Sequence, residues 1–119
     1  MKWAIGVFAL IAVLAAQTPP AGKVLFDKRC GGCHALDRDK EGPRLGGVYG
    51  RRAGSVEGFD YSAALKNSKI AWDARSLDQW LANTESLVPN NDMAFHVESA
   101  GERQAIVEYL RMLPSNSAR

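Results

Sequence analysis

The apolar positions along the chain predict several short helices and no convincing strand pair. Leu77, Trp80 and Leu81 recur at i, i+3 and i+4, so residues 73–81 are expected to form a helix with one apolar face. The remaining pattern is weaker and predicts helices at residues 24–30 and 62–67 and a loop at residues 85–95. The predicted architecture is therefore helical and rich in loops.

The last helix has the clearest pattern. Ser99 and Glu102 form the sequence S-A-G-E, a capping box in which each side chain bonds the other residue's backbone N–H. Apolar residues then follow at i, i+3, i+4 and i+7, and a proline ends the helix: Ile106, Tyr109, Leu110, Leu113 and Pro114.

Between the predicted helices, residues 35–61 show little periodicity. Six of the 11 glycines of the chain lie between Gly42 and Gly58. A loop of this length is uncommon in a small domain unless it has a function. A few short helices also bury little surface by themselves, so we expect something other than protein to fill the centre of the domain.

The N-terminal segment MKWAIGVFALIAVLAA differs from the rest of the chain. After Lys2 it is apolar over residues 3–16, which is short of the roughly 20 residues that a membrane span needs. The length suits a secretory signal, and the small Ala15 and Ala16 suit its cleavage site. We predict a signal peptide at residues 1–16, with an uncleaved membrane anchor as the alternative, and one domain at residues 17–119.

The composition limits the number of domains and the kinds of partner that the protein can have. With 119 residues, 46% of them hydrophobic and 24% charged, the chain is of the size and polarity of a single globular domain. The net charge is +2 and no basic run is present, which argues against a nucleic-acid partner. Export would place the cysteines in an oxidising compartment, where disulfides form and where bacteria attach haem covalently.

The motif CGGCH at residues 30–34 contains both cysteines and one of the two histidines. A local disulfide and a thiol–disulfide redox site are possible interpretations. A structural zinc site would need two further ligands, and a thioredoxin-like site would follow a strand, which the pattern does not predict. Cys-x-x-Cys-His is also the attachment sequence of a c-type haem, in which each thiol adds to one vinyl group and the histidine reaches the iron. In an exported, helical and loop-rich domain, we favour covalent haem.

With this motif the chain resembles a class I cytochrome c, closest to the mitochondrial type and its small bacterial relatives. The resemblance extends from about residue 22 to residue 110 and comprises several motifs in order. The first helix and the attachment site of the family look like GKVLFDKRCGGCH, and its glycine-rich loop looks like EGPRLGGVYGRRAGSVEGFDYS. The Trp-bearing segment and the next helix look like IAWDARSLDQWL, and the methionine loop looks like VPNNDMAF. The resemblance implies an all-α fold, with three to four short helices and a glycine-rich loop wrapped around one covalent haem c.

The resemblance also implies which residues hold the haem. Cys30 and Cys33 would attach it, with His34 as the proximal and Met93 as the distal iron ligand, and Pro43 would accept the imidazole N–H of His34 on its carbonyl. Further residues match family positions around the haem: Arg51 (or its neighbour Arg52), Tyr61 and Trp72 match those that hold the propionates, Phe95 matches the aromatic beside the haem edge, and Trp80 replaces a distal tyrosine.

The function implied is that of an exported, periplasmic monohaem carrier of single electrons. Such a protein is not an enzyme; it is expected to be a monomer that docks transiently with redox proteins, such as those of a respiratory chain. The lysines that surround the haem edge in the mitochondrial type are replaced here by Glu85, Ser86 and Asp92, so we expect association to depend only mildly on salt. The alternative is a haem-based ligand sensor or weak peroxidase with an open or labile distal site, where His96 replaces Met93.

Overall fold

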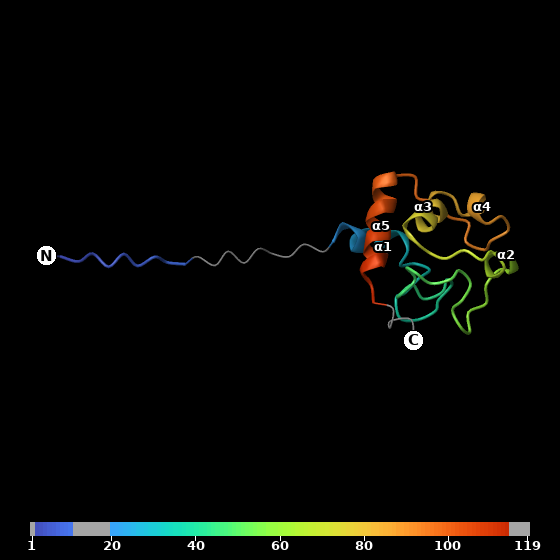
Figure 1. The fold of residues 1–119 in the computed structure, drawn as a ribbon, viewed down its shortest axis with the longest axis horizontal. Coiled ribbons are helices and arrows are strands. Elements are labelled where there is room, and N and C mark those ends of the chain that lie inside the picture. Colours follow the sequence, from blue (N-terminus) through green and yellow to red (C-terminus); the bar gives the residue numbers. More distant parts are fainter. Residues whose placement is uncertain (1, 11–19, 115–119) are drawn as a thin grey trace.

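The structure is a computed structural model that describes residues 2–10 and 20–114. The regular elements in these residues are helices, with no strand among them: α1 (Ala21–Arg29), α2 (Ala63–Lys66), α3 (Ala74–Ala82), α4 (Thr84–Leu87) and α5 (Ala100–Met112). Figure 1 shows α1 crossing α5 and α3 lying beside α5. The long helix-free segment before α2 runs below these helices in the view. The all-α prediction is confirmed.

Side-chain caps begin the helices α3 and α5. Asp73 accepts a hydrogen bond from the Ser76 N–H at 2.8 Å, and Ser76 Oγ accepts one from the Asp73 N–H at 2.9 Å, which is a complete capping box. The Ser99 side chain accepts a hydrogen bond from the Glu102 N–H at 3.3 Å. The second bond of the predicted box, from the Ser99 N–H to the Glu102 side chain, is not found among the described residues. The Glu102 carboxylate instead lies 2.7 Å from the guanidinium of Arg29 on α1.

Helix α4 was not expected, because residues 85–95 were predicted to be loop. It is a single turn with no apolar periodicity to reveal it. Asn83 ends α3 in an extended conformation, and its side chain accepts a hydrogen bond from the Ser86 N–H at 3.1 Å. This cap allows the chain to turn and start a second helix directly.

Helix α1 packs closely against α5 in the protein core. Gly22 lies so close to α5 that a Cβ atom built on it would be 2.1 Å from the Ala105 carbonyl oxygen. One turn later the Phe26 and Tyr109 rings lie 5.6 Å apart, and Ile106 and Leu110 of α5 belong to the same buried cluster as Phe26. A glycine is needed here because the two backbones nearly touch.

The glycine-rich loop is attached to the segment before α3. Arg52 and Ala71 form an isolated antiparallel bridge. On one side of it the Trp72 N–H donates to the Arg51 carbonyl at 2.9 Å, and on the other the Ala53 N–H donates to the Ile70 carbonyl at 2.8 Å. This short pairing brings Arg51 and Trp72 together although they belong to different segments of the chain.

The described part of the N-terminal segment, residues 2–10, has no regular secondary structure, and its apolar side chains are exposed. The proposed cleavage site at Ala15 and Ala16 lies outside the described residues. Among the described helices, none has the length and apolar character required to cross a membrane.

Candidate functional site

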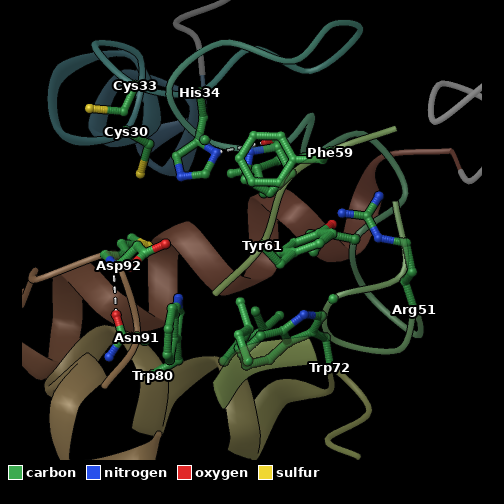
Figure 2. Close-up of a pocket in the computed structure, with 18 of the residues that line it drawn as sticks. Cys30, Cys33, His34, Arg51, Phe59, Tyr61, Trp72, Trp80, Asn91 and Asp92 are labelled. Carbon is green, nitrogen blue, oxygen red and sulfur yellow. Dashed lines mark hydrogen bonds between the residues drawn. The ribbon is translucent and has the colours of Figure 1, made fainter. Parts of the chain in front are cut away.

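A cavity of about 250 Å³ lies between the helices and the glycine-rich loop. Figure 2 shows Cys30, Cys33 and His34 on one side of it, and Trp80 and Asp92 across from them. Its walls are mainly apolar and come from segments far apart in the sequence: Leu45, Val48, Leu65, Leu77, Leu81, Ile106 and Leu110. The predicted site residues meet here with one exception, Phe95.

The attachment motif forms one helical turn directly after α1. The Cys33 and His34 N–H groups both donate to the Cys30 carbonyl, at 3.2 and 2.9 Å. Positions i, i+3 and i+4 of such a turn lie on the same side, so both thiols and the imidazole reach the same cavity. Burial raises the pKa of Cys30 to about 11, and a hydrogen bond to Glu41 raises the pKa of the exposed Cys33.

His34 is oriented by the backbone of the loop that follows. Its Nδ1 donates to the Pro43 carbonyl oxygen at 2.7 Å, as the resemblance implied. A carbonyl can only accept, so Nδ1 carries the proton and Nε2 keeps a lone pair for a metal. Burial lowers the pKa of His34, which favours this neutral form. Gly42 allows the fit, because a Cβ atom there would be 2.2 Å from Cε1 of the ring.

Met93 lines the cavity from the loop after α4, and Thr84 holds this loop in place. Thr84 is 1% exposed, and its hydroxyl donates to the Met93 carbonyl at 2.8 Å and accepts from the Phe95 N–H at 3.2 Å. The Asn91 side chain accepts from the Met93 N–H at 2.7 Å. Neither Thr84 nor Asn91 was identified from the sequence, because their role depends on contacts that a local pattern does not show.

One end of the cavity is polar. Arg51 and Arg52 both line the cavity, but Arg51 is the more buried of the two, and its guanidinium donates to the carbonyls of Arg44 at 3.0 Å and Gly46 at 3.4 Å. Tyr61 accepts from the Val56 N–H at 3.0 Å, which leaves its own O–H available as a donor. Burial lowers the pKa of Arg51 and raises that of Tyr61.

The indole N–H of Trp72 belongs to the same polar end. Trp72 is buried, lines the cavity and lies beside Trp80, with the two rings 5.5 Å apart. A buried indole N–H usually finds an acceptor. Arg51, Tyr61 and Trp72 together therefore offer donors to carboxylate groups.

Phe95, which the resemblance predicts beside the haem edge, is half-buried, and a different aromatic residue lines the cavity. Phe95 packs against the protein core but is not among the residues that line the cavity. Phe59 does line it, and its ring lies 4.8 Å from that of Tyr61 in an edge-to-face contact. The aromatic pair in the sequence F-D-Y after Gly58 is the only local signal that would have pointed to Phe59.

His96 lies away from the cavity. It lines a separate surface groove together with Arg29, Glu98, Ser99 and Glu102. The predicted alternative in which His96 replaces Met93 would therefore require the methionine loop to rearrange.

The cavity as a whole fits the covalent haem that CGGCH predicts. Two thiols and an imidazole with an available Nε2 lie on one wall, a thioether comes from another loop, and donors for two carboxylates lie at one end. The zinc alternative has less support, because the described residues contain no group of three or more His, Cys, Asp or Glu side chains that could hold a metal ion.

Comparison with known proteins agrees with this chemistry. A family model described as Cytochrome c matches residues 20–114. Cytochrome c of Euglena viridis is 41% identical over 95 residues, which cover 77% of this chain and 93% of the relative. Cytochrome c type-1 of Ascaris suum is 39% identical over 93 residues, which cover 76% of this chain and 83% of the relative.

Two solved structures share the fold. Cytochrome cH from Methylobacterium extorquens matches with a TM-score of 0.73 and 36% identity, over 76% of this chain and 94% of that one. Ferricytochrome c2 from Rhodopseudomonas palustris matches with a TM-score of 0.74 and 29% identity, over 82% of this chain and 100% of that one. The chain therefore belongs to the cytochrome c family of electron carriers, which bind iron in a covalently attached haem c.

Proposed function

We propose that the protein transfers single electrons through one haem held by Cys30 and Cys33, with His34 and Met93 as the two axial ligands. The observation that supports this assignment is that His34 and Met93 line the same apolar cavity. Figure 2 shows Asp92, the residue before Met93, across the cavity from His34. The bound haem supplies the Fe(II)/Fe(III) couple.

The protein orients the iron ligands, keeps water away from the haem and determines which side chains bind the iron. Two strong protein ligands leave no open position for a substrate, which suits a carrier and not an enzyme. A methionine thioether opposite histidine raises the reduction potential, and so do apolar walls, because both disfavour the extra charge of the oxidised state. The hydrogen bonds of Thr84 and Asn91 hold the methionine loop, so little has to move when the electron is transferred.

The first test is the far-red absorption of the oxidised protein, where iron bound to a methionine sulfur gives a weak charge-transfer band. Substitution Met93→Ala is expected to abolish the band, lower the potential and admit carbon monoxide. Met112→Ala serves as the control, because Met112 is 71% exposed and does not line the cavity. A Met93→Ala protein that keeps the band and excludes carbon monoxide would show that Met93 is not the ligand.

The ligand sensor or weak peroxidase is tested in the same experiment. It requires that the wild-type protein lack the methionine band while haem remains covalently attached. If His96 were the distal ligand, His96→Ala and not Met93→Ala would change the spectrum. The position of His96 in a separate groove argues against this outcome.

We further propose that residues 1–16 direct export to the periplasm and are removed, leaving a monomeric domain at residues 17–119. The short apolar segment supports export, with a membrane anchor as the alternative. Mass determination of the protein purified from the periplasm would decide. A mass without residues 1–16 and with one haem added is expected, whereas a full-length, membrane-bound product would favour the anchor.

A further inference from the structure

We propose that Asp39 is a positioning residue for the His34 ligand, and that its carboxylate strengthens the His34 hydrogen bond through the Pro43–Arg44 peptide group and so lowers the reduction potential. This inference rests on the proposed role of His34 as an axial ligand. It concerns a carboxylate that does not line the cavity and that the sequence did not single out.

The geometry places one peptide group between two hydrogen bonds. On one side, the Pro43 carbonyl accepts from Nδ1 of His34 at 2.7 Å. On the other, the Arg44 N–H donates to Oδ1 of Asp39 at 2.9 Å. The Pro43 carbonyl and the Arg44 N–H belong to the same planar, conjugated amide. An acceptor on the N–H therefore increases the negative charge on the carbonyl oxygen, as in other chains of hydrogen bonds.

The Asp39 carboxylate is well suited to this role. Its Oδ2 lies 3.3 Å from the Arg44 guanidinium, and the two side chains are only 28% and 21% exposed, so both the position and the charge of Asp39 are protected from solvent. Hydrogen bonds to an ionised acceptor are roughly twice as strong as neutral ones. The polarisation of the Pro43–Arg44 amide is therefore larger than a neutral acceptor or water would produce.

The effect on the iron has a definite sign. A stronger acceptor at Nδ1 draws the ring proton away and makes the imidazole a better electron donor at Nε2. A better donor stabilises the oxidised iron more than the reduced iron. Asp39 should therefore favour Fe(III), opposing the effect of the methionine.

Removing the charge is not expected to open the loop. Backbone bonds close it independently of the Asp39 side chain, because the Lys40 N–H donates to the Gly42 carbonyl at 2.9 Å and the Gly42 N–H donates to the Cys33 carbonyl at 2.8 Å. Substitution Asp39→Asn also keeps an oxygen that can accept from Arg44. The matched control is Asp37→Asn, which removes the same charge from an exposed carboxylate that lies 3.4 Å from Arg38.

The experiment measures two quantities on haem-loaded protein. We expect Asp39→Asn to shift the redox equilibrium toward the reduced state by roughly two- to fivefold, because each bond in a chain changes its neighbour by a modest fraction. At 59 mV per tenfold this is a rise of about 20 to 40 mV in the potential. The Nδ1 proton of His34 in the reduced protein should move upfield in the NMR spectrum, and Asp37→Asn should change both quantities much less.

The outcomes distinguish a failure of the proposed iron ligands from a failure of the proposed role of Asp39. If the wild-type protein lacks the methionine band, the assignment of Met93 fails while the role of Asp39 can still be measured; if it lacks the His34 ring proton, the His34 assignment fails and the role of Asp39 fails with it. If the wild-type spectra are as expected but Asp39→Asn and Asp37→Asn shift the potential equally, or leave the ring proton unmoved, only the role of Asp39 is wrong.

A measurement on the wild-type protein keeps the proposal testable even if Asp39→Asn fails to fold. The Arg44 amide proton should exchange slowly with solvent and resonate far downfield, as expected for a bond to a shielded carboxylate. Rapid exchange of that proton would overturn the proposal, and slow exchange together with a downfield shift would support it.

Discussion

At the scale of single residues, the site depends on small side chains as much as on ligands. Gly42 is an example, because its missing side chain leaves the space that the His34 ring occupies. The resemblance identified His34 and Pro43 from neighbouring motifs. It did not identify Gly42 or Asp39, whose roles arise only when the loop folds back over the imidazole.

Substitution Gly42→Ala tests that close contact. The added methyl group would be 2.2 Å from Cε1 of His34, so the ring or the loop must shift. Overpacking of this kind costs about 1–3 kcal/mol in the free energy of unfolding. Urea unfolding of the haem-loaded protein, followed at the Soret band, should show this loss together with a weakened axial-ligand spectrum.

The matched control is Gly32→Ala. Gly32 lies in the attachment motif, but a methyl group added to it would have no neighbouring atom within 4 Å. The unfolding midpoint and the spectrum of this variant should stay close to those of the wild type. Equal losses in the two variants would mean that the contact between residue 42 and His34 is unimportant.

At the scale of helices, the crossing of α1 and α5 sets the position of the attachment motif. The motif follows α1 directly, so any change in the crossing moves both thiols and His34. The amphipathic pattern predicted α3 and α5 well because their apolar faces repeat at helical spacing. It missed α4, a single turn held by the Asn83 cap. Of the capping box predicted at Ser99 and Glu102 only the Ser99 half forms, because the Glu102 carboxylate pairs with Arg29 on another helix.

Substitution Gly22→Ala should separate the two crossing helices. The new methyl group would meet the Ala105 carbonyl oxygen at 2.1 Å, and backbone atoms cannot turn aside as a flexible side chain can. The free energy of unfolding should fall by about 1–3 kcal/mol, which lowers the Tm of a domain of this size by roughly 4–8 °C per kcal/mol. Differential scanning calorimetry on the haem-loaded protein measures both.

Gly101→Ala makes the same chemical change in α5 at a position where the nearest neighbour is Ser99 Oγ at 3.8 Å. Alanine forms helix more readily than glycine, so the Tm of the Gly101→Ala protein should be unchanged or slightly higher than that of the wild type. A Gly22→Ala protein as stable as the Gly101→Ala protein would contradict the close helix contact.

At the scale of the whole molecule, charge around the cavity is mixed. The exposed charged residues that line it include three acids and one base: Glu41, Asp60, Asp92 and Arg52. This small excess of acids is opposite in sign to the net charge of +2 of the whole chain, and salt largely screens exposed charges beyond the Debye length. The surface therefore favours short-lived docking guided by contact more than by long-range attraction.

Electron exchange with small charged reagents tests this field. Oxidation by the hexacyanoferrate(III) anion and by a cationic cobalt(III) complex should each change by less than about tenfold between roughly 10 mM and 500 mM salt, in keeping with weak steering. Stopped-flow absorbance at the haem band gives both rates. A steep fall for one reagent and a steep rise for the other would reveal a strongly charged docking surface.

The sequence by itself determined the covalent attachment chemistry, because the two thiols and the imidazole lie within one helical turn. It also determined α3 and α5, whose apolar residues repeat at helical spacing. Only the tertiary structure decided which distant groups surround the cavity and its loops: Arg51 as the more buried of two neighbouring arginines, Phe59 in the cavity wall, and the bonds of Thr84 and Asp39. Such contacts depend on how loops without periodicity fold over the cavity, which no local pattern records.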